Sequence, residues 1–215
     1  MSASARPLYD EASTYLGQLD GDWAALIAEV GPCTIISNED REPHEALMRA
    51  IAYQQLAVRA GDTILGRLLA LYPGVHFPSP AQLLETDDAI LRGCGFSFRK
   101  IATLKTIAEA AISGVVPTRA QAEQMSDEAL IERLVSLKGI GRWTVEMFLM
   151  FTLGRQDILP VDDFGVREGY RLLKSLEAQP TPKALREIGG AWAPYRTVAS
   201  WYLWRVPRKR AGIMT

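Results

Sequence analysis

The chain has 215 residues, of which 48% are hydrophobic and 23% charged, a composition typical of a globular protein. No run of about 18 apolar residues occurs and no signal peptide is recognisable, which argues against a membrane span and favours an intracellular protein. Two isolated cysteines and two histidines, without ligand spacing, argue against a zinc or iron-sulfur site.

Apolar residues recur at spacings of three and four along the sequence, which predicts a protein built of helices. Two short helices are expected over residues 9–19 and 23–30, followed by one or two helices over 45–71. Residues 76–80 include two prolines and are predicted to form a connection.

The next helices are predicted from residues that commonly cap helix amino termini. Thr86 is expected to cap a helix over 87–92, and Ser97 or Phe98 is expected to start a longer helix that ends at Gly114. Further helices are expected to start at Thr118, Ser126 and Thr181. Because no repeat or long linker divides the sequence, we expect one all-α unit over residues 1–215, with two helical lobes and a cleft.

The net charge of −1 conceals a difference between two parts of the sequence. Residues 1–132 contain 10 basic and 18 acidic side chains, whereas residues 133–215 contain 14 basic and 7 acidic ones, a net charge of +7. A basic part of this kind is what contact with phosphates requires, but the charge alone is weak evidence for nucleic-acid binding.

A glycine-rich turn is predicted between two helices in residues 137–144, LKGIGRWT. Gly139 and Gly141 leave the backbone bare on both sides of Ile140. Backbone N–H groups at the helix start that follows could hold a phosphate, although an ordinary turn between helices has the same pattern.

Two adjacent aspartates, Asp162 and Asp163, follow an apolar stretch and precede an amphipathic helix in the segment 158–167. Either one could serve only as a helix cap. A carboxylate at a helix amino terminus is also held in its charged form by the helix dipole and the N–H groups. A negative charge of this kind stabilises a sugar cation during hydrolysis of a glycosidic bond.

Together, LKGIGRWT and LPVDDFGV resemble the hairpin and catalytic-aspartate motifs of the helix-hairpin-helix (HhH-GPD) DNA glycosylase superfamily, most closely its 3-methyladenine DNA glycosylase II branch. The resemblance extends from about Leu47 to Trp204. It implies an all-α enzyme of base excision repair that flips alkylated bases, of the 3-methyladenine or 7-methylguanine type, out of damaged double-stranded DNA and removes them by hydrolysis. We expect it to act as a monomer.

The resemblance assigns the catalytic role to Asp163, with Asp162 as its capping neighbour. It implies contacts to DNA from the hairpin, and the matching residues are Gly139, Ile140, Gly141, Arg142 and Thr144. It also implies a monovalent cation, Na+ or K+, bound by the backbone carbonyls of Val135, Leu137 and Gly139. No other cofactor is expected.

The base pocket that the resemblance implies includes Trp143, Met147 and Trp204, whose aromatic faces would attract an electron-poor alkylated purine. Met147 stands where a close bacterial member of this family has tyrosine, which leaves base selectivity open. We also expect this chain to lack the amino-terminal β-domain of that bacterial protein.

The residue that fills the space left by the flipped base is expected in the segment AIAYQQLAVRAG. Gln55 matches the family's wedge position, with Gln54 and Leu56 beside it. An ordinary role for these residues, with Leu56 in the core and the glutamines on the surface, is the alternative.

Two other functions are compatible with parts of the sequence. A hairpin of this type also occurs in DNA-binding modules without catalytic activity, but such a module needs neither Asp163 nor paired tryptophans. Glycosylases that also cleave the DNA backbone carry a lysine nucleophile where this chain has Trp143, so a bifunctional enzyme for oxidised bases is disfavoured.

Overall fold

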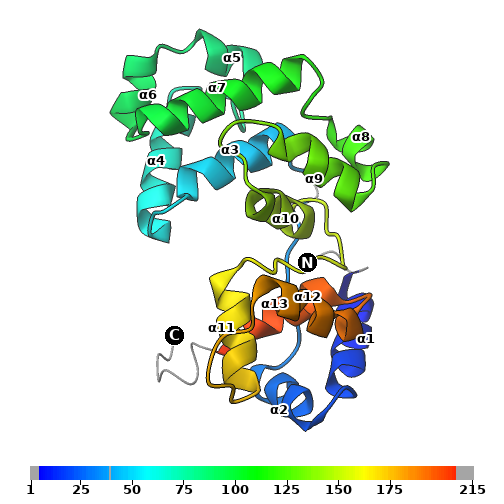
Figure 1. Cartoon of the computed structure of the whole chain (residues 1–215). Helices are drawn as coiled ribbons and strands as arrows, with labels where there is room; N and C mark the ends of the chain where they lie inside the picture. The colour runs from blue at the N-terminus through cyan, green and yellow to red at the C-terminus, as the bar shows by residue number, and fades with distance from the viewer. Residues whose placement is uncertain (1–4, 39, 207–215) are drawn as a thin grey trace. The chain divides into compact units, whose positions relative to one another are not determined.

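In the computed structural model, which describes residues 5–38 and 40–206, the chain is helical throughout (Figure 1). This part of the chain contains α-helices and one 3-10 helix, and no strand. The helices are α1 (Ala5–Gly17), α2 (Gly21–Val30), α3 (Pro43–Tyr53), α4 (Val58–Ala70), α5 (Pro80–Glu85), α6 (Asp88–Cys94), α7 (Phe98–Ile112), α8 (Arg119–Glu123), α9 (Asp127–Val135), α10 (Arg142–Phe151), α11 (Phe164–Leu173), α12 (Pro182–Ile188), η1 (Gly189–Trp192) and α13 (Arg196–Leu203).

The all-α architecture and the two helical lobes expected from the sequence are confirmed. The chain divides into a first unit, Met1–Asn38 with Leu149–Thr215, and a second unit, Glu39–Phe148. Within the described range, no helix combines the length and the apolar character that a membrane span requires.

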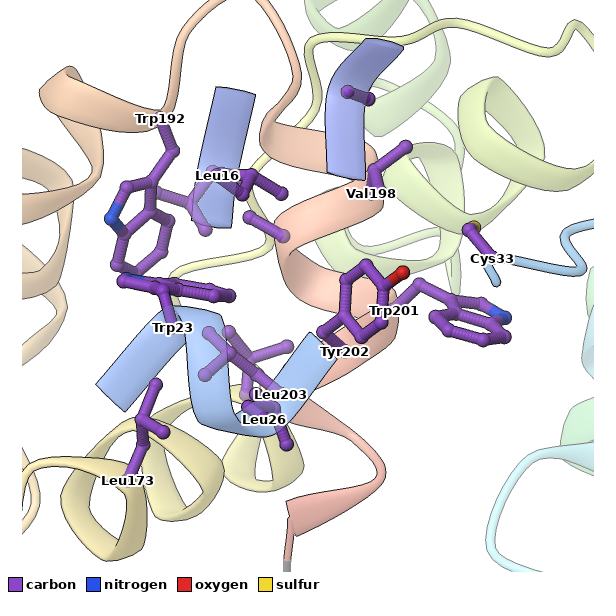
Figure 2. Packing of buried hydrophobic residues seen from close by; sticks show 14 of the residues in the cluster. Leu16, Trp23, Leu26, Cys33, Leu173, Trp192, Val198, Trp201, Tyr202 and Leu203 are labelled. Carbon is purple, nitrogen blue, oxygen red and sulfur yellow. The ribbon is translucent and has the colours of Figure 1, made fainter. Parts of the chain in front are cut away.

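The core of the first unit lies where α1, α2, α11, η1 and α13 pack together. Figure 2 shows Trp23 beside Trp192, with their ring centroids 5.4 Å apart, and Leu203 of α13 beside Leu26 of α2. These side chains are almost completely buried, and every residue of α13 from Thr197 to Leu203 is buried as well. The helix is therefore fixed from several directions.

Gly169 allows α11 and α13 to approach each other closely. A Cβ atom at this position would lie 2.1 Å from the backbone oxygen of Leu203, a distance that no side chain tolerates. The close approach fixes the carboxy-terminal end of α13, including Trp204, relative to α11.

The second unit is organised around α7, which packs against α3, α5 and α6. Ile101, Leu104 and Ile107 lie on its buried face, at the spacing of three expected from the sequence. Its amino-terminal half also contacts the turn after α9, because a Cβ atom at Gly139 would lie 2.3 Å from the hydroxyl oxygen of Thr103.

Most of the helix starts predicted from capping residues are confirmed. The hydroxyl of Ser97 accepts a hydrogen bond from the N–H of Lys100, and Thr118 forms a capping box with Gln121. Ser126 and Thr181 cap α9 and α12 in the same way. The predicted region 45–71 forms two helices, separated by residues 54–57.

The prediction around Thr86 was wrong. Residues 76–80 do not form only a connection, because Ser79 and Gln82 make a capping box that opens the short helix α5 at Pro80. Thr86 instead ends α5, since its hydroxyl donates to the carbonyl of Gln82. Asp87 caps α6 by accepting a hydrogen bond from the N–H of Ala89.

Both cysteines, Cys33 and Cys94, are buried. Burial raises the pKa of the Cys33 thiol to about 11 and also raises the pKa of Cys94. Neither cysteine belongs to the site described next.

Candidate active site

Asp163 occupies the N-cap position of α11. Its Oδ1 atom accepts a hydrogen bond of 2.8 Å from the backbone N–H of Val166, three residues along the chain. The expectation that Asp162 would be the cap was wrong, because the side chain of Asp163 reaches this N–H while that of Asp162 is exposed to solvent. Asp163 is half-buried, so its carboxylate is fixed to the helix without being removed from solvent.

Trp204 provides the second hydrogen bond to the same oxygen atom. The indole Nε1–H donates to Asp163 Oδ1 at 2.8 Å, across 41 residues of sequence. The indole ring also stacks on Phe151, with ring centroids 6.0 Å apart and an interplanar angle of 28°. Two N–H donors, one from the backbone and one from a side chain, stabilise the negative charge of the carboxylate and fix its orientation.

Gly165 provides the space for this pair. A Cβ atom at position 165 would lie 2.8 Å from Cδ1 of Trp204 and 3.1 Å from Oδ1 of Asp163. The backbone here has ordinary helical geometry, so the glycine is explained by the close approach of the indole rather than by an unusual conformation. Gly165 was not predicted as a site residue, although it stands only two residues after Asp163 in the sequence.

The loop that leads to Asp163 is held by α13. Thr197 is almost completely buried, and its hydroxyl donates to the carbonyl of Arg155 while accepting a hydrogen bond from the N–H of Ile158. Arg196 forms hydrogen bonds of 2.6 and 2.7 Å with both carboxylate oxygens of Asp157. The same short helix therefore fixes both the approach to Asp163 and the Trp204 indole that bonds to it.

Helix α11 is further stabilised by a charged cluster on its side. Arg171 donates two hydrogen bonds to Glu168, and Gln179 donates a third. The bonds from Arg171 and then Gln179 lower the pKa of Glu168 to about 2. This cluster connects α11 to the segment that follows it.

The hairpin predicted at residues 137–144 lies in the second unit, between α9 and α10. Gly139 has a φ angle of +93°, a left-handed conformation that favours glycine, and it packs directly against Thr103. The Ile140 side chain is buried, so a contact of this residue with DNA would have to use its backbone. Thr144 is also buried, and its hydroxyl accepts a hydrogen bond of 3.4 Å from the side-chain amide of Gln54.

The two basic side chains of the hairpin have different surroundings. Arg142 makes two hydrogen bonds of 3.0 and 3.1 Å with Glu128 and one of 3.0 Å with Glu146. The bonds to Glu128, followed by those to Glu146, raise the pKa of Arg142. Lys138, which sequence analysis did not include among the DNA-binding residues, is exposed at the turn.

Several of the predicted DNA-contacting and pocket residues of the second unit line one cavity of about 740 Å³. It is lined by Ala50, Tyr53, Gln54, Gln55, Leu56, Arg99, Gly139, Trp143 and Met147. Trp143 is 43% exposed, an unusual degree for tryptophan, and Leu56 is 40% exposed. The alternative role of Leu56 as a core residue is therefore wrong.

Three residues that line this cavity were not predicted from the sequence: Ala50, Tyr53 and Arg99. Arg99 offered a signal, because it forms a basic pair with Lys100 in the first turn of α7. Tyr53 and Ala50 gave none, since both fit the apolar pattern of α3. Trp204, predicted for the base pocket together with Trp143 and Met147, belongs to the first unit, where it bonds to Asp163.

The cavity includes the short loop between α3 and α4, the region predicted to contain the wedge. Gln55 has a φ angle of +57°, a left-handed conformation that is rare for residues other than glycine. Gln55 and Leu56 are exposed, whereas Gln54 is half-buried. The loop therefore holds two exposed side chains at a strained turn.

The carbonyls predicted to hold a monovalent cation have suitable chemistry. Val135 is the last residue of α9, where backbone carbonyls lack donors from their own helix. The carbonyl of Leu137 accepts one hydrogen bond, from the N–H of Ile140 at 3.0 Å, and Gly139 turns the chain next to it. Among the residues that the structure describes, no group of three or more His, Cys, Asp or Glu side chains could hold a metal ion.

Comparison with known proteins identifies the family. Residues 48–194 match the model of the HhH-GPD superfamily of base excision DNA repair proteins. The chain is 46% identical to DNA-3-methyladenine glycosylase 1 of Schizosaccharomyces pombe over 92% of its own length and 87% of that protein.

Solved structures agree with the family assignment. A structure of the Schizosaccharomyces pombe 3-methyladenine DNA glycosylase Mag1 in complex with abasic DNA has a TM-score of 0.87 and 45% identity, covering 95% of this chain and all of that one. A DNA-3-methyladenine glycosidase of Bacillus halodurans has a TM-score of 0.81 and 35% identity, covering 94% and 91%. The hairpin, the capped aspartate and these similarities lead to one conclusion: the chain belongs to the HhH-GPD superfamily of base excision DNA repair proteins.

Proposed function

We propose that this protein is a monofunctional DNA glycosylase that excises alkylated bases of the 3-methyladenine and 7-methylguanine type from duplex DNA. The single observation that carries the proposal is the geometry of Asp163, whose Oδ1 atom is bonded to the N–H of Val166 and to the indole of Trp204 at 2.8 Å each. A DNA-binding module without catalytic activity has no use for a carboxylate held in this way.

The chemistry requires one negative charge and a good leaving group. As the bond between the sugar C1′ atom and the base nitrogen breaks, its electron pair leaves with the base and positive charge develops on the sugar. The carboxylate of Asp163 stabilises that charge, and water then adds at C1′ and gives up a proton. An alkylated purine that already carries a positive charge leaves as a neutral base, so no general acid is required.

The hairpin supports the monofunctional assignment. Trp143 stands at the position where glycosylases with lyase activity carry a lysine nucleophile, and an indole cannot form a Schiff base with the sugar. Hydrolysis therefore leaves an intact abasic strand as the product.

The proposal also covers the contacts with DNA, the cation at the hairpin, the oligomeric state and the location of the protein. The hairpin backbone and Lys138 would contact phosphates, and Gln55 or Leu56 would fill the stack when the damaged base is extruded. At the hairpin, the carbonyls of Val135, Leu137 and Gly139 would hold Na+ or K+, which supplies a positive charge for a DNA phosphate. We further propose that the protein acts as a monomer inside the cell.

The test is base release from duplexes that each carry one defined alkylated base, measured under single-turnover conditions. Asp163→Asn keeps the shape and the hydrogen bonds of the side chain but removes its charge, so base release should be abolished while DNA binding is retained.

Asp162→Asn is the matched control, because Asp162 is the exposed neighbour that does not cap α11. It should cost much less activity than Asp163→Asn. Full activity of the Asp163→Asn variant would contradict the proposed mechanism.

A further inference from the structure

The loop between α3 and α4, residues 54–57, is connected to the rest of the second unit by an unusual contact from α7. The ammonium group of Lys100 donates a hydrogen bond of 3.0 Å to the carbonyl of Ala52 and another of 2.9 Å to the carbonyl of Gln54. These carbonyls lie on either side of Tyr53, the last residue of α3. One side chain therefore binds the backbone at the point where the helix ends and the loop begins.

This arrangement places a lysine where its own helix disfavours it. Lys100 lies in the first turn of α7, next to the positive end of the helix dipole, and burial lowers the pKa of its ammonium group. Both effects act against a positive charge at this position. The carbonyls at the negative end of α3 compensate for them, which indicates that the contact with the loop accounts for the lysine.

The residue that directly follows the bound segment is the strained one. Gln55 has a φ angle of +57°, and the N–H of Leu56 donates to the carbonyl of Tyr53 at 3.1 Å to close the turn. A strained backbone conformation persists only where the surroundings hold it. Lys100 provides such a hold, because its bond to the Gln54 carbonyl fixes the peptide that leads into Gln55.

The same helix also supports the hairpin. Thr103, one turn after Lys100, is the residue against which Gly139 packs. Helix α7 thus contacts both the hairpin and the loop that carries Gln55 and Leu56. Arg99, the residue before Lys100, lines the cavity of about 740 Å³ together with residues of that loop and of the hairpin.

We propose that Lys100 is a positioning residue for base extrusion, which holds the loop 54–57 so that Gln55 is presented in its strained conformation. The inference rests on the proposed glycosylase function and assigns to Lys100 no contact with the reacting atoms. It predicts that loss of the two hydrogen bonds hinders extrusion of the base, whereas the hydrolysis step that depends on Asp163 is unaffected.

The experiment compares Lys100→Met, which keeps the length of the side chain but removes its donors, with Lys100→Arg, which keeps donors. Lys105→Met is the matched control, because Lys105 lies on the same helix and bonds to the side chain of Asp88 at 2.5 Å. Each variant is assayed in single-turnover excision of 7-methylguanine, placed either opposite cytosine or opposite an abasic-site analogue that leaves it unpaired.

We expect Lys100→Met to slow excision of the paired lesion by about ten-fold, the factor that corresponds to roughly 1.4 kcal/mol of loop strain. Excision of the unpaired lesion, which needs less work to extrude, should change little. Lys100→Arg should restore most of the loss, and Lys105→Met should resemble the wild type. The double variant of Lys100→Met with Gln55→Ala should be no slower than Gln55→Ala alone, because Lys100 acts through Gln55 and has no further effect once the Gln55 side chain is removed.

Equal losses on the paired and unpaired lesions would overturn the proposal, as would independent effects in the double variant. The salt dependence of DNA binding provides a further check. If Lys100→Met reduces the log–log salt slope by about 0.9 relative to the wild type, the lysine contacts a phosphate and the proposal is overturned.

Hydrogen exchange separates this inference from the proposed function. The N–H of Leu56 should exchange faster in free Lys100→Met than in the wild type, while exchange in the hairpin stays unchanged. If the wild-type protein releases no alkylated base, the proposed function fails, and unchanged exchange at Leu56 would overturn the role of Lys100 independently.

Discussion

Substitution of Gly165 by alanine tests whether the hydrogen bond between Trp204 and Asp163 matters for the reaction. The new Cβ atom would lie 2.8 Å from Cδ1 of the indole and 3.1 Å from the carboxylate, so the indole must retreat by about 0.6 Å to reach an ordinary contact of 3.4 Å. A retreat of this size lengthens the bond from 2.8 Å beyond the range of good hydrogen bonds.

The expected loss of activity follows from the strength of such a bond. A hydrogen bond to a charged group contributes roughly 1.5–3 kcal/mol, so single-turnover excision should slow by about ten-fold to one-hundred-fold. The free energy of unfolding should change less, because alanine favours the helix by roughly 0.5–1 kcal/mol over glycine and this offsets part of the crowding.

Gly66→Ala is the matched control. Gly66 lies in the middle of α4, and a Cβ atom there would meet no atom within 4 Å. This variant should be more stable by roughly 0.4–1 kcal/mol and fully active. If Gly165→Ala folds normally and excises alkylated bases at the wild-type rate, the bond between Trp204 and Asp163 has no part in the reaction.

Four other predictions follow from the site and its surroundings. Trp204→Phe removes the N–H but keeps an aromatic ring, so excision of cationic 7-methylguanine and of neutral hypoxanthine should slow by the same factor. A larger loss on 7-methylguanine would instead assign the indole to base stacking. Lys138→Met should reduce the log–log salt slope of duplex binding by about 0.9. Arg142→Met should reduce the slope by less, because Arg142 is already paired with Glu128 and Glu146. Equal slopes for the two variants would contradict a phosphate contact from Lys138. The folded-state pKa of Glu168 lies at about 2 instead of 4.5, so its carboxylate stabilises the protein above pH 4.5 and loses this effect as the pH falls toward 2. The difference in unfolding free energy between the wild type and Glu168→Gln should therefore shrink between pH 4.5 and pH 2. A difference that stays constant over this range would refute the charge effect. Borohydride should trap no covalent complex with DNA, and the abasic strand should stay uncut until alkali is added; efficient trapping would reveal a lysine acting as a lyase.

Sequence analysis predicted local features of the fold well, because each depends on residues a few positions apart. Ser97, Ser126 and Thr181 cap helices through an N–H group three residues ahead, which the sequence displays directly. Helix α5 was missed because the two prolines at positions 78 and 80 suggested a connection, whereas Pro80 occupies the first turn of the helix, where proline is tolerated.

The candidate site was predicted only in part. The aspartate was identified through the motif, but the bond from Trp204 joins residues 41 positions apart and has no local signature. The reason for Gly165 also depends on this distant indole, as does the reason for Gly169 on the backbone of Leu203. Lys100 is visible in the sequence only as one member of a basic pair at the start of α7, because its partners are backbone carbonyls at the end of α3 and in the loop that follows.

The burial of the two cysteines matters for an enzyme that acts where alkylating agents are present. Such agents attack thiolates much faster than thiols, and a cysteine with a pKa of about 11 is almost entirely in the thiol form at neutral pH. Cys33 is therefore a poor target both for its charge state and for its burial, and Cys94 is shielded in the same way. Burial thus protects both cysteines from the type of damage that the protein is proposed to remove from DNA.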